Sequence, residues 1–419
     1  MKLELIIIGN ELLQGKVQEI NGHWLAGFLA NKKIELSRIN IIKDDSKLIQ
    51  EATKRSLQRA EIVLLTGGLG PTEDDLTKQA LTDMFSKKLI VTKHSLDLAK
   101  EHYQRIGRNF EDANTNYEKI PEDFFPIRNH VGLAPGLRFI TADGKLVLAT
   151  PGVPREFYHM FEHEIYPYIE KNFEMNKKIK KILSIRTKDI SEEKIFSQLC
   201  PHLWADLSQF GYVSSLPQIL NVDIGVQIEY EKESEFQEKQ EKIKKLVNGT
   251  KLKEYIWHWG DESLEQLIVE NAKAKKIKFG FAESCTGGLN SERITNVSGS
   301  SSVFWGSVVS YSNEIKTNIL KVNPETIRNF GAVSEQTAIE MAQGAVKELG
   351  IDIAISSTGI AGPTGGSEIK PVGTIVIGHA TKNGNAYAQT FHLHGDRVGL
   401  KRRFSQKALF ELLEQINRY

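Results

Sequence analysis

A hydroxyl, a thiol and two glycines are gathered in one short stretch of the chain, Ser284-Cys285-Thr286-Gly287-Gly288. Residues 277–281 before it alternate in the way typical of a β-strand, and the residues from Leu289 onward are typical of a helix. A turn between a strand and a helix leaves backbone N–H groups unpaired at the positive end of the helix, where they suit an anion or an oxyanion. From this stretch alone, capping of the helix by Ser284 or Thr286 explains the residues as well as catalysis does.

A lysine with suitable chemistry lies in a second segment, Tyr311-Ser312-Asn313-Glu314-Ile315-Lys316. Ser312 and Asn313 follow a strand-like run and form a plausible cap pair, which places Lys316 about one turn into a new helix. A serine beside a buried lysine is a recurrent nucleophile and base in acyl transfer, because burial lowers the pKa of the lysine. Taken alone, however, Lys316 is better explained as a solvated helix lysine.

Cys285 competes with Ser284 as the nucleophile, because a thiolate at a helix N-terminus is activated by the same field. We favour a neutral, buried cysteine beside the glycines. A further glycine-rich loop, Gly359 to Gly366, follows a run at 353–358 that is typical of a buried strand. We expect this loop to meet the Ser284 turn and Lys316, since buried strands that end in glycine-rich loops bring those loops to one edge of a sheet.

The N-terminal part contains a different pattern, in which a glycine-rich loop precedes a run of carboxylates. The apolar residues 62–65 indicate a strand buried on both faces, and residues 66–72 supply the loop. Glu73, Asp74 and Asp75 follow it directly. Carboxylates beside a phosphate-binding loop can hold a divalent cation, although an acidic first helical turn placed for the helix dipole needs no function.

Length and composition describe an ordinary globular protein with more than one domain. The chain has 419 residues and a formal net charge of +1, so we expect two or three domains and no polyanionic partner. Cys200 and Cys285 are far apart, which fits a reducing cytoplasm, and the apolar N-terminal run at 3–8 is too short to span a membrane.

The middle of the chain is rich in lysine from about Asn172 onward, which suggests a domain boundary. A strand at 219–230 and a charged helix at 232–247 are expected after it. Glutamates alternate with the lysines and no Gly-x-x-Gly clamp is present, so a solvated surface is a better interpretation than a nucleic-acid site.

Four N-terminal motifs resemble the molybdopterin-binding-like domain of the CinA (competence/damage-inducible) family. They are Gly-Asn-Glu-Leu-Leu at 9–13, Thr-Gly-Gly-Leu-Gly-Pro-Thr-x-Asp-Asp-Leu-Thr at 66–77, Gly-Leu-Ala-Pro-Gly at 132–136 and Pro-Gly-Val-Pro-x-Glu at 151–156. The resemblance implies a three-layer α/β domain with metal-dependent ADP-ribose pyrophosphatase activity, which requires a divalent metal, alone or with potassium. It gives Glu11, Asp44 and Asp75 as metal candidates and Gly67, Gly68 and Gly70 as phosphate-binding residues. Asn10 and Leu133 depart from the pattern, which expects a small hydroxyl-bearing or acidic residue at the first position and Thr at the second.

Five C-terminal motifs look like the CinA C-terminal domain, at 282–288, 311–316, 331–335, 358–366 and 370–374. The resemblance implies a nicotinamide-nucleotide amidase that needs no cofactor and converts nicotinamide mononucleotide (NMN) to nicotinate mononucleotide and ammonia. On this mapping Ser284 attacks the carboxamide, Lys316 is the base and Tyr311 positions or relays. The expected substrate-binding residues are Cys285, Thr286, Gly287, Gly288, Thr358, Gly359, Gly362 and Arg397.

The resemblance also implies the overall organisation: two three-layer α/β domains, at 1–170 and 256–419, joined by a small α+β, KH-like connector at 171–255. The expected partners are the nucleotides NMN and ADP-ribose and a second copy in a homodimer. Two alternatives stay open. The N-terminal domain could bind or adenylylate molybdopterin, or the protein could be a nucleotide sensor without turnover.

Overall fold

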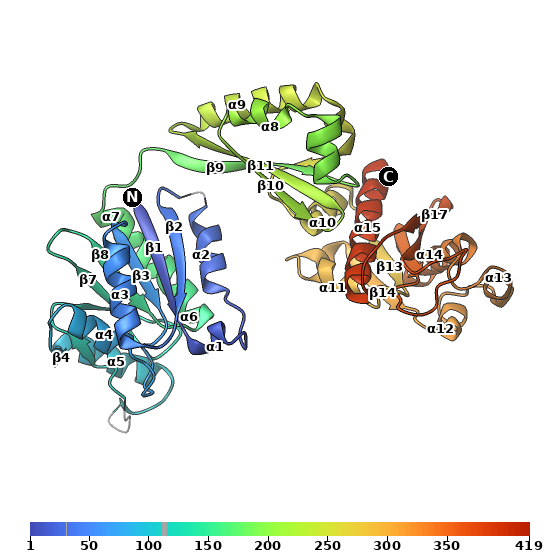
Figure 1. Ribbon diagram of the computed structural model, residues 1–419. Coiled ribbons are helices and arrows are strands. Elements are labelled where there is room, and N and C mark those ends of the chain that lie inside the picture. The colour runs from blue at the N-terminus through green and yellow to red at the C-terminus, as the bar shows by residue number, and fades with distance from the viewer. Residues whose placement is uncertain (31, 111–114) are drawn as a thin grey trace. The chain divides into compact units, whose positions relative to one another are not determined.

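The computed structural model describes residues 1–30, 32–110 and 115–419. Figure 1 shows the helices and strands of the chain. Contacts between residues divide the chain into two compact units. The first consists of Met1–Lys181 with Gln227–Lys239, and the second consists of Ile182–Val226 with Gln240–Tyr419.

A six-stranded sheet forms the centre of the first unit, in the order β2-β1-β3-β8-β7-β6. The first four strands run parallel, and the last two are antiparallel to their neighbours. The strands are β1 (Lys2–Ile8), β2 (Glu35–Ile42), β3 (Ile62–Thr66), β6 (Phe125–Ile127), β7 (Gly136–Ile140) and β8 (Leu146–Thr150), with a separate pair β4 (Leu89–Val91) and β5 (Lys119–Pro121).

Helices cover both faces of this sheet, which confirms the three-layer prediction. Along β3 successive side chains enter opposite cores: Leu64 packs with one set of helices and Val63 with the other. This is why residues 62–65 of β3 are all apolar, rather than apolar at alternate positions. One face carries α2 (Asn21–Leu29), α6 (Pro154–Met160), the π-helical turn η2 (Phe161–Ile165) and α7 (Tyr166–Asn172), and the other α3 (Ser46–Leu57) and α4 (Thr77–Met84); α1 (Asn10–Leu13) and α5 (Lys93–Arg105) complete the unit.

A four-stranded sheet of order β10-β11-β9-β12 lies in the middle of the sequence. Two of its strands and α9 have residues in both compact units, so the predicted connector at 171–255 does not separate as a unit of its own and stays a prediction. The elements are β9 (Ile179–Thr187), η3 (Lys194–Leu199), α8 (Leu203–Ser208), β10 (Tyr212–Gln218), β11 (Asn221–Tyr230), α9 (Glu233–Asn248), η4 (Lys251–Tyr255) and β12 (Ile256–Trp259).

The second unit contains a five-stranded sheet of order β14-β13-β15-β16-β17. The strands are β13 (Phe279–Glu283), β14 (Phe304–Val309), β15 (Ile353–Gly359), β16 (Thr374–Thr381) and β17 (Ala386–His392). The first three strands in this order are parallel, so the carboxyl ends of β13, β14 and β15 meet at one edge. The Ser284 turn, the Lys316 segment and the Gly359 loop all begin at that edge, as the sequence predicts.

Helices on both faces complete a second three-layer fold. One core joins Phe281 of β13 to α10, α11 and α15, and the other joins Ala282 of the same strand to α14. The helices are α10 (Leu264–Lys275), α11 (Leu289–Thr295), η5 (Ser300–Ser302), α12 (Asn313–Asn318), α13 (Pro324–Phe330), α14 (Glu335–Leu349) and α15 (Arg397–Arg418). None of the helices in the described residues is both long enough and apolar enough to span a bilayer.

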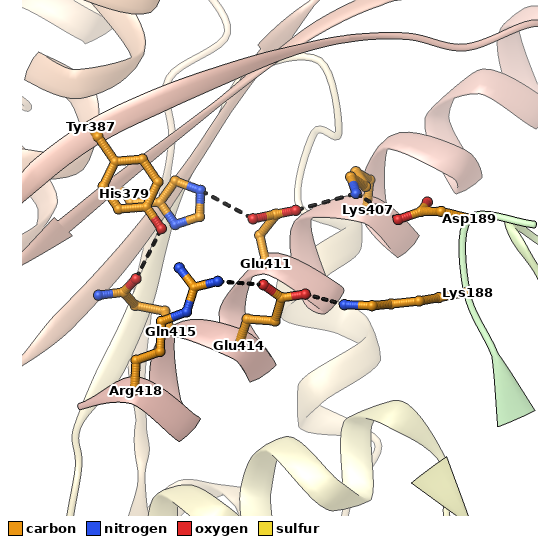
Figure 2. A network of polar contacts seen from close by, with 9 residues as sticks. All are labelled: Lys188, Asp189, His379, Tyr387, Lys407, Glu411, Glu414, Gln415 and Arg418. Carbon is orange, nitrogen blue, oxygen red and sulfur yellow. Dashed lines mark hydrogen bonds and ion pairs between the residues drawn. The ribbon is translucent and has the colours of Figure 1, made fainter. Parts of the chain in front are cut away.

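A buried polar network holds α15 in place within the second unit (Figure 2). Lys407 contacts Asp189, which follows β9, at 3.0 Å and Glu411 at 3.3 Å. Glu411 in turn lies 3.5 Å from Nε2 of His379 on β16. Burial lowers the pKa of His379 to about 4, so this imidazole is neutral at neutral pH. The network therefore fixes the helix whose first residue is Arg397.

Candidate active site

The turn between β13 and α11 carries Ser284 directly after the strand. The Ser284 N–H donates to the Ser357 carbonyl at 2.8 Å, which ties the turn to β15. Gly287 and Gly288 have φ angles of 58° and 94°, a left-handed conformation that favours glycine. The two glycines allow the chain to turn sharply enough to leave the serine at the sheet edge.

The N-terminus of α11 is already occupied by a carboxylate of the protein. Glu283 is fully buried, and its carboxylate accepts hydrogen bonds from the N–H groups of Gly288 (2.9 Å), Asn290 (3.2 Å) and Ser291 (3.0 Å). These N–H groups of α11 are therefore already used within the protein, and an oxyanion site at this turn stays a prediction that depends on the N–H groups before the helix. The alternative that Ser284 or Thr286 caps the helix is wrong. Glu283 supplies the negative charge that the helix dipole favours.

Ser284 and Lys316 form a close pair at the sheet edge. The Lys316 Nζ lies 3.0 Å from the Ser284 Oγ, 2.7 Å from the Ser310 carbonyl and 3.5 Å from the Tyr311 carbonyl. Ser312 caps α12 by accepting from the Ile315 N–H at 3.2 Å, which confirms the predicted cap that brings Lys316 back to the strand end.

Lys316 is 1% exposed and forms no ion pair within the described part of the chain. Burial lowers the pKa of its ammonium group, because no carboxylate compensates for the lost hydration. A neutral amine has two N–H donors and one lone pair. Its two carbonyl neighbours can take the donors, so that the lone pair faces the Ser284 hydroxyl.

Cys285 belongs to the hydrophobic core of this unit and is 8% exposed. Burial raises the pKa of its thiol to about 12, so the thiolate is scarce at neutral pH. Gly359 leaves no room for a side chain, because a Cβ atom there would lie 2.7 Å from the Thr374 carbonyl oxygen and 3.2 Å from the Cys285 Sγ. These contacts make Cys285 and Gly359 packing partners and favour Ser284 over Cys285 as the nucleophile.

Two backbone N–H groups remain available for an oxyanion. The N–H of Gly287 donates to the Ser284 carbonyl at 3.2 Å, and Gly288 is bound to Glu283. The N–H groups of Cys285 and Thr286 donate to no other residue that the structure describes. They are adjacent to Ser284, so they are placed for the oxyanion that the substrate carbonyl oxygen becomes when the Ser284 Oγ attacks its carbon.

Two predicted substrate-binding hydroxyls have partners inside the protein instead. The Thr286 Oγ1 lies 2.8 Å from the Ser357 Oγ, and both residues are fully buried. The Thr358 Oγ1 donates to the Ala332 carbonyl at 2.8 Å. Both side chains therefore stabilise the loops around the site.

Arg397 and Tyr311 lie together at the edge of the same site. The Arg397 guanidinium donates to the Gly362 carbonyl at 2.6 Å and to the Tyr311 hydroxyl at 3.2 Å. The Tyr311 side chain is 65% exposed, and its hydroxyl contacts neither Ser284 nor Lys316. The geometry supports a positioning role for Tyr311 through Arg397 and provides no direct proton relay.

Sequence reasoning missed two residues of this site, Glu283 and Lys401. The Lys401 Nζ lies 3.7 Å from the position that a Cβ atom on Gly287 would take. The signal that could have found it is its spacing, since it stands four residues after Arg397 and so on the same face of α15.

The first unit contains a separate cavity of about 630 Å³ at the carboxyl ends of β1 and β3. Leu133, one of the two positions that depart from the expected pattern, lines it, whereas Asn10 donates its N–H to Asp44 at 2.8 Å. All six predicted residues line this cavity: Glu11, Asp44, Gly67, Gly68, Gly70 and Asp75.

The three predicted metal candidates are not assembled as a ligand set. Both Asp75 carboxylate oxygens accept hydrogen bonds from the loop itself, from the Gly70 N–H at 2.8 Å and the Thr72 N–H at 2.9 Å. Burial, together with the charge of Glu11, raises the pKa of Asp44. Across residues 1–30, 32–110 and 115–419, no group of three or more His, Cys, Asp or Glu side chains is arranged to hold a metal ion. Metal binding here stays a prediction.

Comparison with known proteins identifies both halves of the chain. A model of the CinA C-terminal domain matches residues 261–416, and a model described as a probable molybdopterin binding domain matches residues 4–171. A CinA-like protein of Kosmotoga olearia is 36% identical over 98% of this chain and 97% of its own length. The chain belongs to the CinA family. Another CinA-like protein, from Chloroherpeton thalassium, is 36% identical over the full length of both chains.

Among solved structures, the competence/damage inducible protein CihA from Agrobacterium tumefaciens is 36% identical, with a TM-score of 0.36. The match covers 38% of this chain and 97% of that one. Family membership of the whole chain rests on the full-length relatives, and their names state no activity.

Proposed function

We propose that the C-terminal domain of this CinA-family protein is a serine–lysine amidase that hydrolyses the carboxamide of NMN to a carboxylate and ammonia. The observation that carries the proposal is the 3.0 Å contact between the Ser284 Oγ and the Nζ of Lys316, a buried lysine whose pKa is lowered by burial. A lysine in this state can accept the hydroxyl proton without a histidine.

The first half of the reaction forms an acyl-enzyme. The Ser284 Oγ attacks the carboxamide carbon while its proton passes to the Lys316 Nζ, and the carbonyl oxygen becomes the oxyanion. The Cys285 and Thr286 N–H groups are the donors available to that oxyanion. The C–N bond then breaks, Lys316 returns the proton to the leaving nitrogen, and ammonia departs.

The second half releases the acid. Water attacks the acyl carbon and gives a proton to Lys316, the bond to the Ser284 Oγ breaks, and that proton returns to the serine. No redox change occurs and no metal is required. The nucleotide phosphate needs a separate anchor, and Arg397 at the site edge has the guanidinium geometry that suits it.

A second activity is proposed for the first unit, hydrolysis of the pyrophosphate of ADP-ribose. The feature that favours it is the 630 Å³ cavity, which combines glycine-rich loop backbone with several carboxylates. Release of AMP from ADP-ribose, measured with and without added divalent metal and potassium, tests this proposal. Binding of a nucleotide or of molybdopterin without turnover would assign the cavity a binding role instead.

The amidase proposal is tested by ammonia release from purified protein and NMN, with and without EDTA. We expect release that resists EDTA and disappears in Ser284→Ala. Folded wild-type protein that releases no ammonia would refute the proposal and favour a sensor.

A further inference from the structure

The first two turns of α15 carry two cations on one face, Arg397 and Lys401, four residues apart. The nearest acid in sequence, Asp396, is used as the helix cap, where it accepts from the Gly399 N–H at 2.6 Å. Within the described residues neither cation forms an ion pair, and the Lys401 ammonium donates no hydrogen bond.

Both cations are directed at the loops around Ser284. Arg397 donates to the Gly362 carbonyl and the Tyr311 hydroxyl. Lys401 reaches the other side, where its Nζ lies 3.7 Å from the Cβ position on Gly287. Burial is the main cause of the raised pKa of the Cys285 thiol, and the positive charge of Lys401 lowers that pKa slightly. Lys401 is therefore close enough to act on groups in the turn.

Lys401 does not have the environment of a structural lysine. Lys407, six residues further along the same helix, contacts two carboxylates, Asp189 at 3.0 Å and Glu411 at 3.3 Å (Figure 2). Lys401 is half-buried beside a glycine turn, and none of its three N–H donors is used by a residue that the structure describes. An unpaired cation in such a place suits an anion that comes with the substrate.

We infer that Lys401 is a specificity-determining residue that, with Arg397, binds the phosphate of the substrate and so selects a nucleotide over its nucleoside. The inference rests on the proposed amidase function. A phosphate monoester carries a charge of about −1.5 to −2 at pH 7, so one cation leaves it only partly compensated. Arginine supplies planar, directional donors, and lysine supplies a compact point charge.

The test compares NMN with nicotinamide riboside, which has the same carboxamide and no phosphate. The variant is Lys401→Met, and the matched control is Arg402→Met, which removes a neighbouring exposed cation. We expect Lys401→Met to lower kcat/KM for NMN by about 10- to 100-fold, mainly through KM, because a charge-assisted contact is lost. The value for the riboside and both values for Arg402→Met should change little.

An unchanged ratio of NMN to riboside turnover in folded Lys401→Met would overturn the inference. Failure of the amidase proposal looks different, because wild-type protein would then release ammonia from neither compound. In that case calorimetric titration with inorganic phosphate tests whether Lys401 forms an anion site. Weaker phosphate binding by Lys401→Met than by Arg402→Met would support this site, and equal phosphate binding by the two variants would overturn it. Thermal melting of each variant verifies that it is folded.

Discussion

Replacing Lys316 separates its role as a base from its role in holding the strand end. Arginine at this position keeps a cationic donor for the Ser310 and Tyr311 carbonyls, but it cannot lose its proton at any ordinary pH. Methionine keeps the approximate length of the side chain and removes both the base and the donors. If Lys316 is the base, both variants lose catalysis, and only Lys316→Met also loses the hydrogen bonds to the two carbonyls.

Both variants should lower kcat for amide hydrolysis by about 100- to 10,000-fold, the range that a positioned general base contributes. Lys316→Met should also lower the free energy of unfolding by roughly 1–3 kcal/mol, because the fully buried Ser310 carbonyl loses its donor. Ammonia release measures the first effect, and urea denaturation measures the second.

The pH profile gives an independent measure of the same pair. The reaction needs neutral Lys316, and burial lowers its pKa, so activity should rise with pH along a limb whose midpoint lies below about 10.4, the value of a free lysine. A folded Lys316→Arg variant with wild-type kcat, or a wild-type midpoint at the value of free lysine, would refute the assignment of Lys316 as base.

Two further predictions concern the residues beside Ser284, and a third concerns the polar network that holds α15. Cys285→Ala should retain amidase activity within a few-fold. Thiol reagents should not inactivate wild-type protein, because burial raises the pKa of the Cys285 thiol to about 12. Inactivation that tracks modification of Cys285 would contradict this prediction. Glu283→Gln should lower the free energy of unfolding by about 1–3 kcal/mol and reduce ammonia release, because the α11 N–H groups lose a charged acceptor. A urea midpoint equal to that of wild-type protein would show that this cap is dispensable. His379 has a pKa of about 4 in the folded protein and about 6.5 in the unfolded chain, so the unfolded chain binds more protons between these two pH values. The free energy of unfolding should therefore fall by about 3 kcal/mol as the pH drops from 6.5 to 4. In His379→Gln the fall between pH 6.5 and 4 should be smaller by that amount, and an identical fall in urea titrations would count against a neutral buried His379.

The parts of the site that could be predicted from the sequence are those fixed by local rules. Ser312 is a strong cap residue after a strand, and this alone places Lys316 one turn into α12. The buried strand β3 followed by glycines likewise predicted the glycine-rich loop at its carboxyl end, and that loop lines the cavity. In both cases a few neighbouring residues determine the geometry.

The parts that could not be predicted depend on contacts between distant segments or on competition for the same hydrogen bonds. Glu283 ends a strand, and nothing in its sequence position indicates that it folds back onto α11 and accepts from the N–H groups there. Asp75 is a metal candidate from the sequence, and nothing there indicates that N–H groups of its own loop donate to both of its oxygens. Lys401 becomes a site residue only because α15 packs against the Gly287 turn.

In the proposed mechanism the Ser284 Oγ becomes acylated by the carboxamide substrate, and acid quenching during turnover can trap this acyl-enzyme. Wild-type protein mixed with NMN is quenched, digested and analysed by mass spectrometry, with Ser284→Ala as the control. We expect a nicotinate mononucleotide acyl group on the peptide that contains Ser284, absent from the control. Turnover by Ser284→Ala at the wild-type rate, or an adduct on Cys285 instead, would contradict it.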